Sequence, residues 1–126
     1  MSPEKQLPHD HHENEIAFNF LCANIDHIED FRIVSNIFKQ LGDPTRLRIF
    51  WLLCHCEECV QNIAAMMNMS SPAISHHLRP LKASGLITSR REGKEVYYRA
   101  ADSQQTKLLH IMMEQVMKIS CQLCPK

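Results

Sequence analysis

The sequence lacks any long apolar run. None of its 126 residues fall in a stretch approaching the roughly 20 apolar residues that a membrane-spanning helix needs. The polar amino-terminal residues, MSPEKQLPHDHHENE, also lack the apolar centre of a signal peptide. We therefore expect a cytoplasmic protein without a membrane partner. In that reducing compartment, the six cysteines indicate metal binding or thiol chemistry rather than disulfides.

The sequence also lacks net charge, because its formal charge is zero at pH 7. The charges are nevertheless unevenly distributed. Residues 1–43 carry three basic and eight acidic side chains, whereas residues 44–99 carry eight basic and four acidic ones. Attraction to phosphates depends on such a local excess rather than on the total. Residues 44–99 are therefore the candidate nucleic-acid-binding segment.

A short amphipathic helix is predicted between Ser70 and Gly85. Ser70 or Ser71 is a candidate N-cap, Pro72 suits the first turn, and Gly85 suits the residue beyond the last turn. At about 100° per residue, one face of this helix is apolar and consists of Ile74, Leu78 and Leu81. The opposite face is small, polar and basic, and consists of Ser71, Ser75, His76, Arg79 and Lys82.

The neighbours of this helix predict a winged helix-turn-helix. Apolar spacing over residues 59–68 indicates a preceding helix, and the β-prone segments 86–89 and 95–99 flank a basic tip. The predicted fold is mainly α, with five to six helices and a two-stranded wing. The predicted contacts to double-stranded operator DNA are Ser71, Ser75, His76, Arg79 and Lys82 on the helix, with Arg90, Arg91 and Lys94 on the wing.

The length fits one domain, which we divide into three parts. Residues 1–13 are expected to form a flexible His-rich arm, residues 14–120 the winged-helix domain, and residues 121–126 a cysteine-containing tail. Within the domain, Asp43 and Pro44 are predicted to start a largely buried helix, and Asp102 is predicted to cap the last one.

The first and last helices carry more apolar surface than a three-helix core needs. They either fold back on their own domain or form a homodimer, which we favour.

Several segments closely resemble the ArsR/SmtB family of bacterial repressors. They are LGDPTRLRI at 41–49, SHHL at 75–78, RREGK at 90–94 and VYY at 96–98, so that the resemblance covers about residues 30–102. It implies a homodimeric repressor, not an enzyme, that releases operator DNA when a metal ion, a metalloid or a thiol-reactive species binds. No small organic substrate is expected.

Neither of two family sensing patterns is intact. The family's Glu-Leu-Cys-x-Cys-Asp pattern aligns with residues 57–62, where only Cys59 matches its cysteines. The family's pattern on the last helix aligns with Asp102, Gln104, Gln115 and Lys118, of which only Asp102 is the residue that the pattern requires.

Three thiols lie within six residues and form the cysteine trio, Cys54, Cys56 and Cys59. Their thiolates could converge on a soft centre such as Cd(II), Zn(II) or As(III), with His55 or the terminal residues Cys121 and Cys124 as supplementary ligands. They could instead form a disulfide in a redox or sulfur sensor, or pack as small core residues. A protein-interaction module without DNA affinity is the alternative from another functional class.

Overall fold

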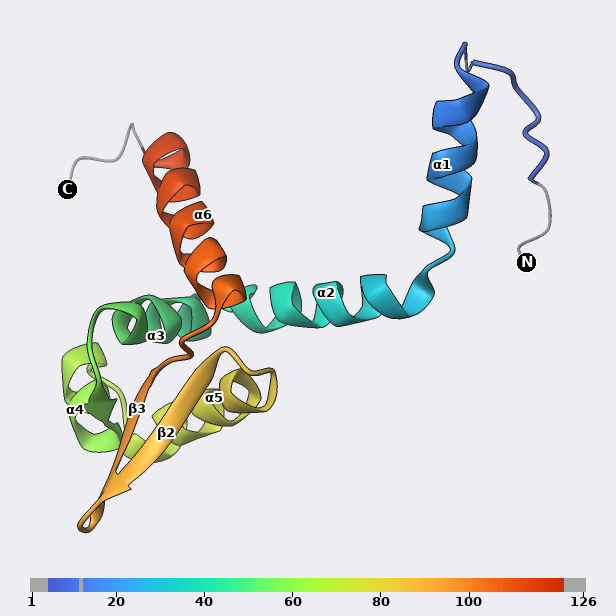
Figure 1. The fold of residues 1–126 in the computed structure, drawn as a ribbon. Coiled ribbons are helices and arrows are strands. Elements are labelled where there is room, and N and C mark those ends of the chain that lie inside the picture. Colours follow the sequence, from blue (N-terminus) through green and yellow to red (C-terminus); the bar gives the residue numbers. More distant parts are fainter. Residues whose placement is uncertain (1–4, 12, 122–126) are drawn as a thin grey trace. The chain divides into compact units, whose positions relative to one another are not determined.

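The computed structural model describes residues 5–11 and 13–121. The chain divides into two compact units, unit 1 (Met1–Asn36) and unit 2 (Ile37–Lys126). Six helices and three strands lie in the described ranges (Figure 1). In chain order they are α1 (Glu15–Ile25), α2 (Ile28–Leu41), α3 (Pro44–His55), β1 (Glu58–Cys59), α4 (Val60–Met67), α5 (Ser71–Ala83), β2 (Ile87–Glu92), β3 (Glu95–Ala100) and α6 (Gln104–Ser120).

Unit 1 contains α1 and most of α2. The Asn14 side chain caps α1 by accepting hydrogen bonds from the backbone N–H groups of Ile16 and Ala17. Lys5 Nζ lies 2.9 Å from Asp26 Oδ1, which ties part of the amino-terminal segment to this unit. The three-part division of the chain, with a flexible arm over residues 1–13, stays a prediction.

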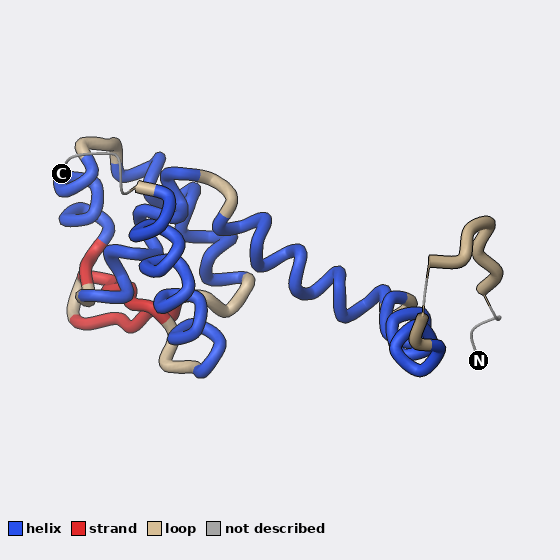
Figure 2. The backbone as a smooth tube through the Cα atoms, turned by 90° about the horizontal axis from the view of Figure 1, so that it is seen from above, coloured by secondary structure: helices blue, strands red, loops and turns tan. Residues whose placement is uncertain are grey.

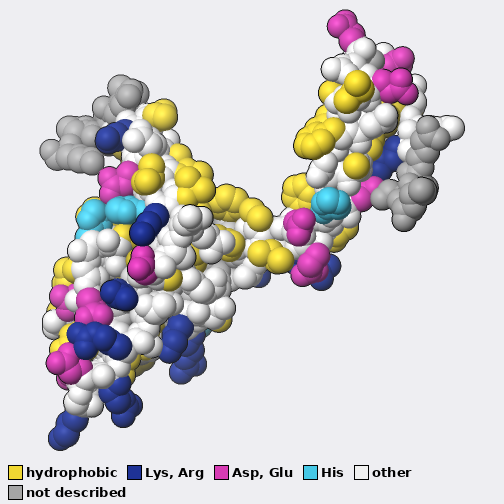
Figure 3. Space-filling view, viewed as in Figure 1, with side chains coloured by type: hydrophobic (Ala, Val, Ile, Leu, Met, Phe, Trp, Pro, Cys, Tyr) yellow, Lys and Arg dark blue, Asp and Glu magenta, His cyan; other side chains and the backbone are white. Residues whose placement is uncertain are grey.

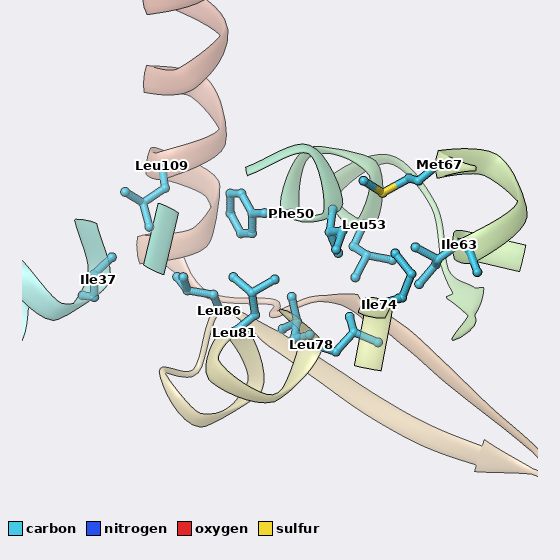
Figure 4. Close-up of a cluster of buried hydrophobic side chains, with 13 residues drawn as sticks. Ile37, Phe50, Leu53, Ile63, Met67, Ile74, Leu78, Leu81, Leu86 and Leu109 are labelled. Carbon is cyan, nitrogen blue, oxygen red and sulfur yellow. The ribbon is translucent and has the colours of Figure 1, made fainter. Parts of the chain in front are cut away.

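The core of unit 2 is built around α3. Asp43 caps this helix by accepting the Arg46 N–H at 2.9 Å, and Pro44 occupies its first turn, as the sequence predicts. Ile49 and Phe50 are fully buried in a core cluster that includes side chains from α4, α5 and α6. Figure 4 shows Phe50 within this cluster. The predicted burial of this helix holds for Ile49, Phe50 and Leu53, whereas the apolar side chain of Trp51 is 40% exposed.

A three-stranded antiparallel sheet, red in Figure 2, completes unit 2. Its strand order is β1-β3-β2. The β2–β3 hairpin is the wing that the sequence predicts, and Gly93 adopts a positive φ of 62° in its turn. The short strand β1 adds to the predicted pair, because Glu58 pairs with Tyr98 and Cys59 with Tyr97. The winged helix-turn-helix prediction is confirmed, and β1 extends the wing's sheet.

The start of α6 differs from the prediction by one residue. Ser103, not Asp102, is the N-cap, and its Oγ accepts the Thr106 N–H at 3.1 Å. Thr106 and Leu109 are buried, so packing of this face against the core sets where the helix begins. Asp102 instead pairs with Lys107 at 3.1 Å. Within the described ranges, no helix is long and apolar enough to cross a membrane.

Candidate nucleic-acid interface and sensing residues

The orientation of α5 is fixed by its cap and by its buried face. Asn68 takes the left-handed conformation, with a φ of 54°, and ends α4 within a tight turn. Ser70 Oγ then caps α5 by accepting the Ala73 N–H at 3.2 Å. Ile74 and Leu81 are fully buried and Leu78 nearly so. The helix therefore turns its other side outward, and this side is here called the α5 face.

The α5 face carries the predicted polar and basic side chains. His76, Arg79 and Lys82 are exposed, whereas Ser71 and Ser75 are half-buried. Lys82 Nζ donates to Ser89 Oγ of the wing at 2.7 Å, so one of these cations links α5 to β2. Figure 3 shows lysine and arginine side chains gathered over α5 and the wing. The cations of α5 and the wing therefore lie on and beside an exposed helix, and the major groove of DNA is wide enough to admit an α-helix.

The basic residues of the wing differ from one another in their partners. Arg90 lies 2.6 Å from Glu57 and 2.7 Å from Glu92, and its guanidinium stacks 5.0 Å from the centre of the Tyr97 ring. The hydrogen bonds from Arg90 lower the pKa of Glu57, and the two carboxylates raise that of Arg90. Arg91 and Lys94 are exposed and have no ion pair among the described residues. Both therefore remain available to phosphates.

The cysteine trio spans the end of α3 and the start of the sheet. Cys54 is half-buried in α3, Cys56 follows that helix with its thiol donating to the Leu52 carbonyl at 3.5 Å, and Cys59 is buried in β1. Burial, together with the negative charge of Glu114, raises the pKa of Cys54 to about 11. Burial and Glu58 likewise raise the pKa of Cys56. Both thiols are therefore protonated at neutral pH in the absence of a ligand.

The other cysteines are dispersed. Cys22 is half-buried in α1 of unit 1, and Cys121 is exposed at the end of α6. Cys124 lies outside the described residues. The described residues hold one group of three ligating side chains whose donor atoms all lie within 4.8 Å of one another, and it contains no cysteine. The thiolate site of the cysteine trio therefore stays a prediction.

That group consists of His55, His110 and Glu114, here called the His-His-Glu cluster. His55 is the last residue of α3, and the other two lie four residues apart on one side of α6. His110 Nε2 lies 3.2 Å from His55 Nε2 and 2.9 Å from Glu114 Oε1, and His55 Nε2 lies 3.3 Å from the same oxygen. Figure 3 shows histidine side chains grouped beside α6.

The polar surroundings favour a charged Glu114. The hydrogen bond from His110 is the largest cause of its lowered pKa, and the Trp51 indole N–H also donates to Glu114, at 3.3 Å. A cavity of about 390 Å³ opens beside the cluster, with Cys54, His55, Cys56 and His110 in its lining. The sequence reasoning found His55 but missed His110 and Glu114. Their spacing of four residues was the available signal, but nothing in the sequence connects them to α3.

The fold and the exposed helix define this protein as a winged-helix DNA-binding protein. The family model described as "Bacterial regulatory protein, arsR family" matches residues 43–89, which run from the N-cap of α3 into β2. An uncharacterised HTH-type transcriptional regulator of Methanocaldococcus jannaschii is 35% identical over 88 residues, covering 69% of this chain and 99% of the relative. The chain therefore belongs to the ArsR family.

Two further relatives are also named as transcriptional regulators. A transcriptional repressor SmtB homolog of Synechocystis is 41% identical over 75 residues, covering 60% of this chain and 57% of the relative. The cadmium resistance transcriptional regulatory protein CadC of Listeria innocua is 46% identical over 66 residues, covering 52% and 56%. This chain therefore spans somewhat more than half the length of these two relatives.

A solved structure shares the architecture. A homodimeric winged helix-turn-helix DNA-binding domain from Mycobacterium bovis is 32% identical, with a TM-score of 0.67, and the match covers 74% of this chain and 86% of that one. These named relatives and this structure are transcriptional regulators or DNA-binding domains, not enzymes.

Proposed function

We propose that this chain is a homodimeric transcriptional repressor that binds double-stranded operator DNA through α5 and the wing. The observation that carries the proposal is the orientation of the α5 face. The opposite side of α5 is buried in the core, so this face points away from the core. Ser71, Ser75, His76 and Arg79 would face base edges in the major groove. Lys82, Arg91 and Lys94 would contact phosphates, and Arg90 would join them only by exchanging its carboxylate partners.

Substitution of Arg79 tests this docking. The affinity of the full chain is measured by fluorescence anisotropy on two duplexes, one with the DNA sequence upstream of its own gene (the cognate duplex) and one with that sequence scrambled. Comparing the two affinities separates contacts to bases from contacts to phosphates. Loss of a base contact in Arg79→Ala should weaken cognate binding by about 1–3 kcal/mol and scrambled binding much less. Lys107→Ala removes one exposed charge from α6 and serves as the control. Unchanged affinity of Arg79→Ala on both duplexes would contradict the proposal.

The proposed dimer would place two α5 helices on two half-sites. Unpartnered apolar side chains on α6 support it, because such surface is costly to leave in water. They include Leu108, Ile111, Met112, Val116 and Ile119, each at least 40% exposed. α1 and α2 also expose apolar residues, including Ile16, Phe20, Phe31 and Val34. The homodimeric Mycobacterium bovis domain supports a second copy as the partner.

We further propose that a metal ion or metalloid releases the repressor from DNA. The cadmium resistance regulator among the relatives supports a metal effector. Cys54 and Cys56 line one cavity, while Cys59 lies in the adjoining strand, so soft ions such as Cd(II), Zn(II) or As(III) have thiols within this region. Because burial raises the pKa of Cys54 and Cys56, metal binding there must release their protons, so effector affinity should fall as the pH drops.

The double variant Cys56→Ser, Cys59→Ser tests the thiolate proposal. If the trio is the sensor, Cd(II), Zn(II) and As(III) should no longer release operator DNA from this variant. Cys22→Ser, in α1 of unit 1, is the matched control and should respond like the parent chain. Unchanged release by all three effectors would show that the trio is structural.

A further inference from the structure

We infer that His55, His110 and Glu114 form a binding site for one divalent transition-metal ion, bridging α3 and α6. Their three donor atoms form a triangle with edges of 2.9, 3.2 and 3.3 Å. A tetrahedral zinc centre with bonds of about 2.0–2.1 Å places its ligand atoms about 3.3 Å apart. The side chains therefore already stand at the spacing that such an ion requires.

Hydrogen bonding does not make all three contacts favourable at once. Each Nε2 atom carries at most one hydrogen, and a histidine nitrogen that carries a hydrogen has no lone pair with which to accept. If both Nε2 atoms are protonated, both can donate to Glu114 Oε1, but the 3.2 Å contact between the two nitrogens then joins two donors. If one is unprotonated, its contact with the Glu114 oxygen joins two acceptors. A cation at the centre would use all three lone pairs at once.

The ligand types indicate the class of ion. Two imidazoles and one carboxylate suit Zn(II), Co(II) and Ni(II), whereas Ca(II) and Mg(II) prefer oxygen ligands and Cu(I) prefers sulfur. The side chains of His55 and Glu114 are 45% and 39% exposed, so an ion reaches them directly from solvent. Three protein ligands leave at least one coordination position for water.

Trp51 supplies support from outside the ligand set. Its indole N–H donates to the same Glu114 oxygen at 3.3 Å, and its ring centre lies 4.5 Å from that of His55. Such outer contacts orient metal ligands and are typical of built metal sites. Because Trp51 is the single tryptophan of the chain, its fluorescence reports directly on this site.

The His-His-Glu cluster is distinct from the other candidate ligands. It uses none of the cysteine trio, and it uses none of Asp102, Gln104, Gln115 and Lys118, the positions that align with the family's pattern on the last helix. Its affinity for metal is measured without DNA. The outcome therefore stands apart from the success or failure of the proposed repressor function.

The test is a titration of the full chain with Zn(II), followed by Trp51 fluorescence, and with Co(II), followed by its visible absorption. The parent chain should bind one ion at this site and change its Trp51 emission. His110→Gln and Glu114→Gln should each weaken that binding by at least about tenfold. His27→Gln, an exposed histidine of unit 1, and the variant with Cys54, Cys56 and Cys59 all changed to Ser should retain it.

Glu114→Gln keeps the size of the side chain and an oxygen that can accept from Trp51, so it decides the matter if His110→Gln is unstable. Two results would overturn the site. One is metal binding by Glu114→Gln equal to that of the parent, with the same change in Trp51 emission. The other is loss of the Co(II) spectrum in the triple Ser variant, which would assign the metal to thiolates instead.

Discussion

At the scale of single residues, the cap of α5 distinguishes two adjacent serines. Ser70 Oγ accepts the Ala73 N–H, whereas Ser71 is the first residue of the helix and makes no such bond. Ser70→Ala should therefore lower the free energy of unfolding by about 1 kcal/mol. Ser71→Ala is the control and should cost clearly less. Urea unfolding measures both, and equal losses would show that the cap is not confined to Ser70.

Asp43 gives the stability of unit 2 a dependence on pH. Its pKa is lowered from 3.8, chiefly because its carboxylate accepts the Arg46 N–H. A carboxyl whose pKa is lower in the folded state stabilises the fold above the unfolded value and loses that effect as the pH falls through the folded value. Asp43→Ala should therefore lower the melting temperature at pH 7. The difference from the parent should shrink below about pH 3.8, and a difference that stays constant down to about pH 3 would contradict this account.

The caps also show how far sequence reasoning reaches at this scale. Asp43 was identified because Pro44 follows it and marks the first turn. At the last helix, Asp102 and Ser103 are adjacent and both are good caps, so local sequence does not choose between them. Burial of Thr106 and Leu109 against the core makes the choice.

At the scale of elements, Arg90 of β2 forms an ion pair with Glu57, the residue before β1. This pair makes the positive charge of Arg90 less available to DNA. Glu57→Gln should leave Arg90 with Glu92 as its carboxylate partner and raise affinity for a scrambled duplex, with a salt dependence steeper by up to about one phosphate contact. Thermal stability should change little, since exposed pairs contribute weakly. Glu58→Gln makes the same charge change next to Glu57, where the side chain accepts from Asn62 instead of arginine. Equal effects of the two variants would mean that only net charge matters.

Some elements can be predicted from their own sequence, whereas others depend on residues far away in the chain. Helices α3 to α5 and the hairpin follow from apolar spacing, caps and turn residues within each segment. Strand β1 does not, because two residues are too few to show a pattern and they pair with Tyr97 and Tyr98 far along the chain. The His-His-Glu cluster escaped prediction for the same reason. Its partners on α3 and α6 are brought together only by packing.

At the scale of the whole molecule, the proposed dimer is tested on α6. Val116→Glu should shift the chain from dimer to monomer in analytical ultracentrifugation, because it would bury a charge against apolar surface. Lys118→Glu places a carboxylate two residues further along the same helix, about 200° around its axis, and should remain dimeric. A dimer formed equally well by both variants would remove α6 from the interface.

The most direct test of a metal-gated repressor is a reciprocal titration. Operator affinity is measured by anisotropy with and without Zn(II) or Cd(II), and metal affinity is measured by competition with a chromophoric chelator with and without operator DNA. If the metal releases the repressor, it should weaken DNA binding by a factor of about 5 to 150, and DNA should weaken metal binding by the same factor. Metal affinity that is identical for the free chain and its DNA complex would contradict the account.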